Sequence, residues 1–199
     1  MVIVGIIVLS IGCIVFFLYK AGNVKGNGII ETLEMEISGF NSIILNGRTT
    51  VNIHKSNENK ISLTIDNNLI KHVSLEVKKN ILTIEQKKCF GIIFTEFVVD
   101  IYTQNINNFT INGSGNINLI DNIFNPTINS TIIVNGSGFF DGKNFETENA
   151  VIKINGSGKA SIAAGKNINA EINGSGHIIY YGNPEIKSKI TGKGKIELK

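Results

Sequence analysis

The chain has 199 residues, enough for one domain with a short additional segment. Its net charge of +3 is too small to indicate a nucleic-acid binding surface, so we expect no nucleic-acid partner. The two cysteines, Cys13 and Cys89, provide neither a metal site nor a disulfide framework. With 37 Ile, 27 Asn and 21 Gly but only 2 Pro, the composition is typical of a protein rich in β-strands and turns.

The first predicted element is an apolar segment at the N-terminus. Residues 2–19 carry no charged side chain and would span roughly 27 Å as a helix, which is just enough to cross a bilayer. We therefore expect residues 1–20 to be a membrane anchor or signal segment and favour an uncleaved, single-pass anchor. Residues 21–36 would then be a tether. A cleaved signal peptide and lipidation at Cys13 are the alternatives.

The side of the membrane occupied by the rest of the chain is left open by the sequence. Lys20 and Lys25 come directly after the apolar segment, and basic residues in that position favour a cytoplasmic location for the C-terminal part of a chain. A count of two lysines is a small bias.

A five-residue motif recurs in the C-terminal half of the chain. It consists of an apolar residue followed by Asn-Gly-Ser-Gly, it begins at Ile111, Val134, Ile154 and Ile172, and an altered copy begins at Ile190. A repeat of about 20 residues predicts a solenoid, in which each unit buries its apolar face against its neighbours. The residues predicted to form the structural turn are Asn112, Gly113, Ser114, Gly115, Asn135, Gly136, Gly138, Asn155, Gly156, Gly158, Asn173, Gly174, Gly176, Gly192 and Gly194.

Alignment of the copies places apolar residues in shared columns at even distances from the leading residue. Residues at even spacing point to the same face of a strand, so these columns predict a core that stacks from repeat to repeat. The asparagine column is expected to share amide hydrogen bonds along the stack. An antiparallel meander is the alternative architecture, because Asn-Gly is also a strong hairpin signal. Insertions are expected to lie in loops, at residues 121–126 and 143–149.

These motifs resemble the head GIN domain of putative auto-transporter adhesins. The resemblance begins at Glu36-Ile37-Ser38-Gly39-Phe40, includes the repeats and the segment from His177 to Tyr181-Gly182-Asn183-Pro184, and ends at Thr191-Gly192-Lys193-Gly194. It implies an all-β fold, a right-handed parallel β-helix, preceded here by one N-terminal transmembrane helix. Residues 37–110 would form less regular first coils and residues 111–199 the regular ones. The resemblance also implies cell adhesion or envelope surface binding, with no catalytic residue.

A search for catalytic or metal-binding chemistry gives no candidate. His54, His72 and His177 are isolated in the sequence, and the motif serines are not in a nucleophile elbow. Asp141 and Glu197 share a column but would lie about 14 Å apart, too far for a glycosidase pair. We therefore expect no enzyme activity, no cofactor and no metal.

The last repeat is rich in lysine. Lys187, Lys189, Lys193 and Lys195 would either prevent edge-to-edge association or bind anionic glycans or other envelope polymers. An outward-facing stripe around Tyr181 would indicate a binding surface. A homo-oligomer stays possible.

Together these features predict a non-catalytic, membrane-tethered module of the cell envelope with most of the chain extracytoplasmic. A structural spacer and a pectin-lyase-like carbohydrate-active enzyme are the alternatives.

Overall fold

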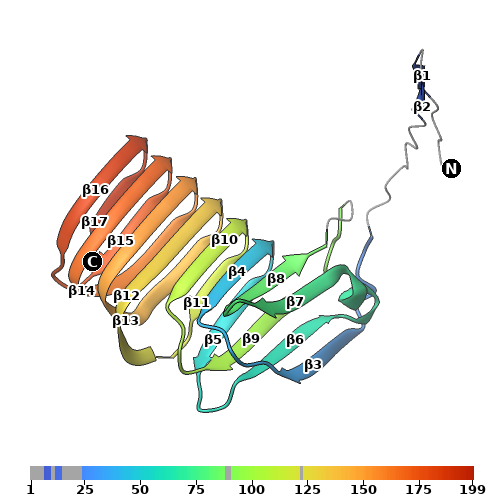
Figure 1. Ribbon diagram of the computed structural model, residues 1–199, viewed down its shortest axis with the longest axis horizontal. Helices are drawn as coiled ribbons and strands as arrows, with labels where there is room; N and C mark the ends of the chain where they lie inside the picture. The colour runs from blue at the N-terminus through green and yellow to red at the C-terminus, as the bar shows by residue number, and fades with distance from the viewer. Residues whose placement is uncertain (1–6, 10–11, 15–23, 88–90, 122) are drawn as a thin grey trace.

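In the computed structural model, the described residues are 7–9, 12–14, 24–87, 91–121 and 123–199. Fifteen strands form one sheet that curls into an open half-barrel, and β1 and β2 form a separate antiparallel pair (Figure 1). The elements are β1 (Ile7–Leu9), β2 (Gly12–Ile14), β3 (Ile30–Glu36), β4 (Ser42–Gly47), β5 (Thr50–Lys55), β6 (Lys60–Asp66), the 3-10 helix η1 (Asn67–His72), β7 (Val73–Lys78), β8 (Ile81–Gln86), β9 (Phe97–Thr103), β10 (Asn108–Gly113), β11 (Asn116–Leu119), β12 (Ile123–Gly136), β13 (Phe139–Gly156), β14 (Lys159–Gly174), β15 (His177–Tyr181), β16 (Glu185–Gly192) and β17 (Lys195–Leu198).

The strands form because apolar residues alternate with polar ones over most of the sheet. In β9, for example, Phe97, Val99 and Ile101 are buried, while the residues between them are half-buried. Period-two alternation of this kind places one face of each strand in the interior. All the buried apolar residues belong to a single core, which includes an aromatic cluster of Phe109, Phe140 and Phe145.

Equivalent residues of the repeats pair in parallel register, so the antiparallel meander is excluded for this part of the chain. Asn112 of β10 pairs with Asn135 of β12, which pairs with Asn155 of β13. The register continues through Asn173 of β14 to Thr191 of β16. The predicted amide bonds between the asparagines are confirmed, with N···O distances of 2.7 to 3.0 Å from Asn46 to Asn173.

The first strands of the sheet are arranged differently. β3 pairs with β6, β6 with β9 and β7 with β8, and all three pairings are antiparallel. β7 and β8 are joined by Lys79 and Asn80, which both have positive φ. A two-residue turn with positive φ at both positions reverses the chain and fits the twist of a hairpin.

The predicted right-handed parallel β-helix behind a transmembrane helix is therefore wrong as a description of this fold. The half-barrel sheet is mixed, since β3, β6, β7 and their partners run antiparallel. Alternation of apolar residues is the same in parallel and antiparallel strands, so the pattern upstream of the repeats could not reveal strand direction.

No helix among the described residues is long and apolar enough to cross a bilayer. Most of the predicted anchor, residues 2–19, lies outside the described residues, which in this stretch are 7–9 and 12–14. Part of the predicted tether is a strand, because β3 covers residues 30–36 and pairs with β6.

Candidate functional site

The two glycines of each repeated motif have different structural roles. The first glycine of the motif, for example Gly156, has a φ of +128°, a value that residues with a side chain rarely adopt. A Cβ added there would lie 2.5 Å from the carbonyl oxygen of Gly136 in the preceding repeat. The second one, as in Gly158, would place its Cβ 2.5 Å from a methyl group of Val134. The motif thus lets successive repeats stack closely at the turn.

The turn is also hydrogen-bonded to the repeat before it. The Ser157 amide donates to the Gly136 carbonyl at 3.0 Å, and the Ser175 amide donates to the Gly156 carbonyl at 2.9 Å. The hydroxyls of Ser137 and Ser157 lie 3.1 Å apart. Repeated copies with the same bonds describe a structural turn rather than a reactive serine.

A pocket opens where β13 and β14 bend. The register between these strands shifts after Gly142, so that residues 143–145 of β13 have no counterpart in β14. This insertion falls within the predicted loop at residues 143–149, but it is accommodated as a bulge inside a strand. Because the bulged strand bends outward, it leaves space above its shorter neighbour.

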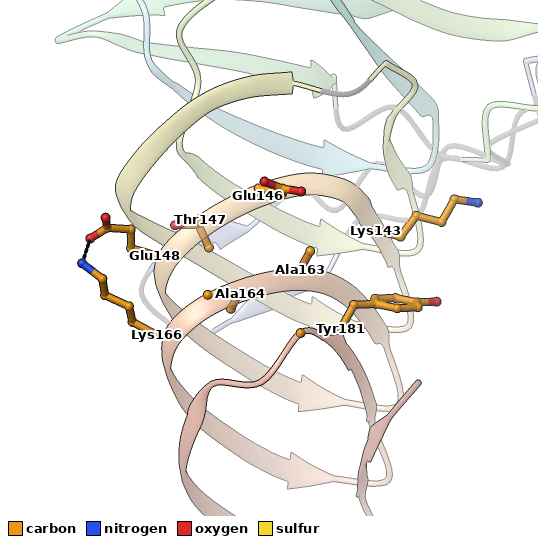
Figure 2. Close-up of a pocket in the computed structure, with 10 residues that line it drawn as sticks. Lys143, Glu146, Thr147, Glu148, Ala163, Ala164, Lys166 and Tyr181 are labelled. Atoms are coloured by element: carbon orange, nitrogen blue, oxygen red, sulfur yellow. Dashed lines mark hydrogen bonds and ion pairs between the residues drawn. The ribbon is translucent and has the colours of Figure 1, made fainter.

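We call this space, with a volume of about 620 Å³, the bend pocket. Figure 2 shows Lys143 and Tyr181 extending toward one side of the bend and Glu148 and Lys166 toward the other. The volume is typical of sites for small molecules. The lining residues are Lys143, Glu146, Thr147, Glu148, Ala163, Ala164, Gly165, Lys166, Tyr181 and Gly182.

The charges of the bend pocket are balanced. Lys166 forms an ion pair with Glu148 at 2.8 Å, and Lys143 lies 3.8 Å from Asp141. Glu146 is exposed, and Tyr181 is half-buried. The pocket therefore combines an aromatic ring, two cations that already have carboxylate partners and the Glu146 carboxylate, for which the described part of the chain shows no ion pair.

The sequence pointed to Tyr181 but not to the rest of this site. Ala163, Glu146 and Lys166 are unremarkable in the linear sequence, since their meeting depends on the bulge. The one available signal was the longer spacing of 20 residues between the second and third motifs, compared with 18 later in the chain.

The predicted lysine face lies at the C-terminal end of the sheet. Among the described strands, β16 pairs only with β14 and β17 only with β15, so both have an open edge. We call residues 185–199, which contain these two strands, the basic edge, and its lysines are Lys187, Lys189, Lys193, Lys195 and Lys199.

Apolar side chains are incompletely covered at the basic edge. Ile190 is 43% exposed and Leu198 is 59% exposed, whereas Ile172, directly beneath Ile190 in β14, is fully buried. The last repeat therefore presents lysines beside part of the core, without a further strand to cover it.

One histidine belongs to the basic edge. The Nε2 atom of His177 lies 2.9 Å from a carboxylate oxygen of Glu197, which also pairs with Lys195. Burial lowers the pKa of His177, and repulsion from Lys195, Lys159 and Lys199 lowers it further. The imidazole is thus held neutral to a lower pH than usual.

The matches with known families decide the identity of the chain. The sequence matches the family described as putative auto-transporter adhesin, head GIN domain, over residues 39–132 and 126–184. The chain belongs to this family. No curated protein matches this head GIN chain at a significant level.

Solved structures also resemble this head GIN chain. A putative adhesin from Bacteroides fragilis NCTC 9343 is 15% identical, with 88% of this chain and 100% of that chain covered and a TM-score of 0.56. A putative adhesin from Parabacteroides merdae ATCC 43184 is 23% identical, with coverage of 88% and 98% and a TM-score of 0.44. A putative lipid binding protein from Parabacteroides distasonis ATCC 8503 is 22% identical, with coverage of 89% and 99% and a TM-score of 0.41. The first of these similarities shows a shared fold and nothing about a ligand.

One further polar group of the head GIN chain was not expected from the sequence. His54, which is isolated in the sequence, lies 3.3 Å from Asp100 and 3.8 Å from Asp121, and its ring stacks on Tyr102. No group of three potential metal ligands occurs among the residues that the structure describes. The His54 group lies on the outer face of β5 and β9, away from the bend pocket.

Proposed function

We propose that this protein is a non-catalytic, membrane-tethered binding module of the cell envelope that holds an anionic surface polymer at its basic edge. The family description names an adhesin, and the apolar residues 2–19 have the length of a membrane anchor. Most of the chain would then be extracytoplasmic.

The observation that carries the proposal is the position and chemistry of the basic edge. β3, the first strand of the sheet in the chain, is an edge strand, and β17 ends the branch that leads from β13 through β14 and β15, at the opposite end of the sheet (Figure 1). A tether that precedes β3 would leave the basic edge as the end farthest from the membrane. There, five lysines stand against two glutamates, Glu185 and Glu197, which gives a positive surface that attracts polyanions.

The two alternative functions, a structural spacer and a carbohydrate-active enzyme, require different surface features. A structural spacer requires no ligand, so its basic edge would serve only to prevent association with other edges. A carbohydrate-active enzyme of the pectin-lyase type requires clustered carboxylates. Asp141 and Glu197 do share a column, but three strand pairings separate them, which is about 14 Å.

The test is binding of the full chain to heparin, with neutral dextran as the control polymer. We expect the double variant Lys187→Gln/Lys189→Gln to bind heparin about tenfold more weakly at low salt, because two cations are lost from an exposed surface. The matched control is Lys153→Gln/Lys159→Gln, which removes two exposed lysines from β13 and β14. The edge variant should also show a weaker dependence of affinity on salt.

Equal losses in the two double variants would mean that net charge alone drives binding and would overturn the assignment to the basic edge. If the native chain does not bind heparin, the result would favour the structural spacer.

A further inference from the structure

The bend pocket is built by one column of three side chains on neighbouring strands. Glu146 of β13 pairs with Ala163 of β14, and Ala163 pairs with Tyr181 of β15. Neighbouring strands lie about 4.8 Å apart, so the strands that carry the carboxylate and the phenol ring are about 9.6 Å apart. Because the side chain between them is only a methyl group, the column leaves a gap with a carboxylate on one side and an aromatic ring on the other.

The surroundings of this gap are small residues. Ala164 and Gly165 follow Ala163 along β14, and Gly182, with a φ of +97°, follows Tyr181. Gly182 packs against the backbone of β14, since an added Cβ would lie 2.5 Å from the Ala164 carbonyl oxygen, whereas a Cβ added at Gly165 would meet nothing closer than the Thr147 carbonyl oxygen at 3.8 Å. At the position between Glu146 and Tyr181, the middle strand contributes only the methyl group of Ala163, which leaves the column open there.

The polar groups of the pocket favour a neutral ligand. Lys166 is paired with Glu148 at 2.8 Å and Lys143 lies 3.8 Å from Asp141, so the positive charge of each ammonium group is already offset by a carboxylate, although each keeps N–H donors for a neutral acceptor. Among the residues that the structure describes, no hydrogen bond or ion pair is found for the Glu146 carboxylate. A carboxylate accepts hydrogen bonds, and the hydroxyls of a neutral ligand can donate them.

The geometry points to a saccharide-binding site in the bend pocket, which takes an uncharged sugar ring between Tyr181 and Glu146. The C–H face of the sugar packs on the phenol ring of Tyr181, and the hydroxyls of the sugar donate hydrogen bonds to the Glu146 carboxylate. Hydroxyl oxygens on the opposite edge accept from Lys143 or Lys166. This site is separate from the basic edge and does not depend on the function proposed for that edge.

The experiment measures binding of neutral sugars to the full chain by saturation-transfer NMR and calorimetry. The probes are cellobiose, chitobiose, maltose and methyl mannoside, with glucose 6-phosphate and galacturonate as charged comparisons. We expect at least one neutral sugar to bind and the charged sugars to bind more weakly.

Two variants of the aromatic ring separate packing from a general loss of structure. Tyr181→Ala removes the ring and should weaken binding about tenfold, whereas Tyr181→Phe keeps it and should remain within about twofold of the native chain. Ala163→Leu fills the gap and should abolish binding without removing any polar group. Tyr102→Ala, which removes another half-buried tyrosine outside the pocket, is the matched control and should bind sugar normally.

Failure of every neutral sugar to bind would overturn the proposal, and so would stronger binding of the charged sugars or equal losses in Tyr181→Ala and Tyr102→Ala. The double variant Lys187→Gln/Lys189→Gln should retain sugar binding, and Tyr181→Ala should retain heparin binding. Each of the two proposed sites can therefore fail without the other.

Discussion

Single glycines determine how closely successive repeats can stack. Gly113, Gly136, Gly156, Gly174 and Gly192 all have φ values between +121° and +131°. At each of them an added Cβ would lie within 2.6 Å of the carbonyl oxygen of the glycine one strand earlier. A substitution at one of these glycines would therefore strain its own backbone and also place a Cβ against the backbone of the neighbouring strand.

We expect Gly156→Ala to destabilise the protein by more than the ~1–3 kcal/mol attributed to an unfavourable φ alone, because the contact with the Gly136 carbonyl adds to it. Gly165→Ala is the matched control. Its nearest neighbour to an added Cβ is the Thr147 carbonyl oxygen at 3.8 Å, an ordinary contact. Urea unfolding of both variants checks the prediction, and similar unfolding free energies would contradict the role assigned to the turn.

At the scale of elements, one buried carboxylate joins three segments that are far apart in the sequence. Asp66, at the end of β6, is completely buried and accepts hydrogen bonds from the backbone amides of Gly28 at 2.9 Å, Thr95 at 2.7 Å and Glu96 at 3.4 Å. Burial by itself would raise the pKa of Asp66, but the hydrogen bonds outweigh it and lower the pKa. The ionised carboxylate thus holds the segment before β3 and the segment before β9 against the end of β6.

We expect Asp66→Asn to lower the unfolding free energy by about 1–3 kcal/mol at pH 7, since an amide can replace only one of the two acceptor oxygens. The pH dependence has a definite sign. Because the folded pKa is depressed, the carboxylate stabilises the native state above its ordinary unfolded pKa and loses that effect as pH falls through the folded pKa.

Unfolding measured from pH 7 down to pH 3 should therefore show a constant difference between native chain and variant above about pH 5, with the gap closing below about pH 4. A gap that is independent of pH over this range would mean that the charge of Asp66 does not matter.

At the scale of the whole molecule, the curled sheet separates two ends with different chemistry. β3 carries Glu31, Glu34 and Glu36 and lies at the end nearest in sequence to the apolar segment. The basic edge lies at the opposite end of the sheet. The membrane tether that we propose at the N-terminus would therefore orient the molecule with the lysines directed away from the membrane.

We expect an epitope tag after Lys199 to be reached by antibody on cells that produce the full chain, without permeabilisation, or on spheroplasts where an outer membrane is present. Under the proposed anchoring, deletion of residues 2–19 should abolish this labelling and leave the protein in the soluble fraction, because the deletion removes an apolar segment long enough to hold the chain in a bilayer. Labelling that requires permeabilisation of the native chain would place the domain in the cytoplasm and contradict the proposed orientation.

Much of the local structure follows from the sequence. The columns of Ile132, Ile152 and Ile154 predict the buried face, and the structure buries all three completely. The asparagine column likewise predicts the amide bonds along the stack. Side-chain period and repeat spacing are local properties, so they can be read without knowing the fold.

The bend pocket could not be predicted in this way, because it depends on which residues of neighbouring strands are paired. Glu146, Ala163 and Tyr181 meet only because a bulge in β13 shifts the register by three residues. Nothing in the three residues themselves indicates that shift.

By itself, the sequence determined the family, the high content of β-strands, the register of the repeats and the need for glycine at the turns, because each of these depends on residue type and spacing. Only the tertiary structure decided that β3, β6 and β7 pair antiparallel with their neighbours, that the sheet is an open half-barrel and that a pocket lies at the bend. Those features depend on hydrogen-bond pairing between distant segments, and strand direction leaves no trace in an alternating pattern.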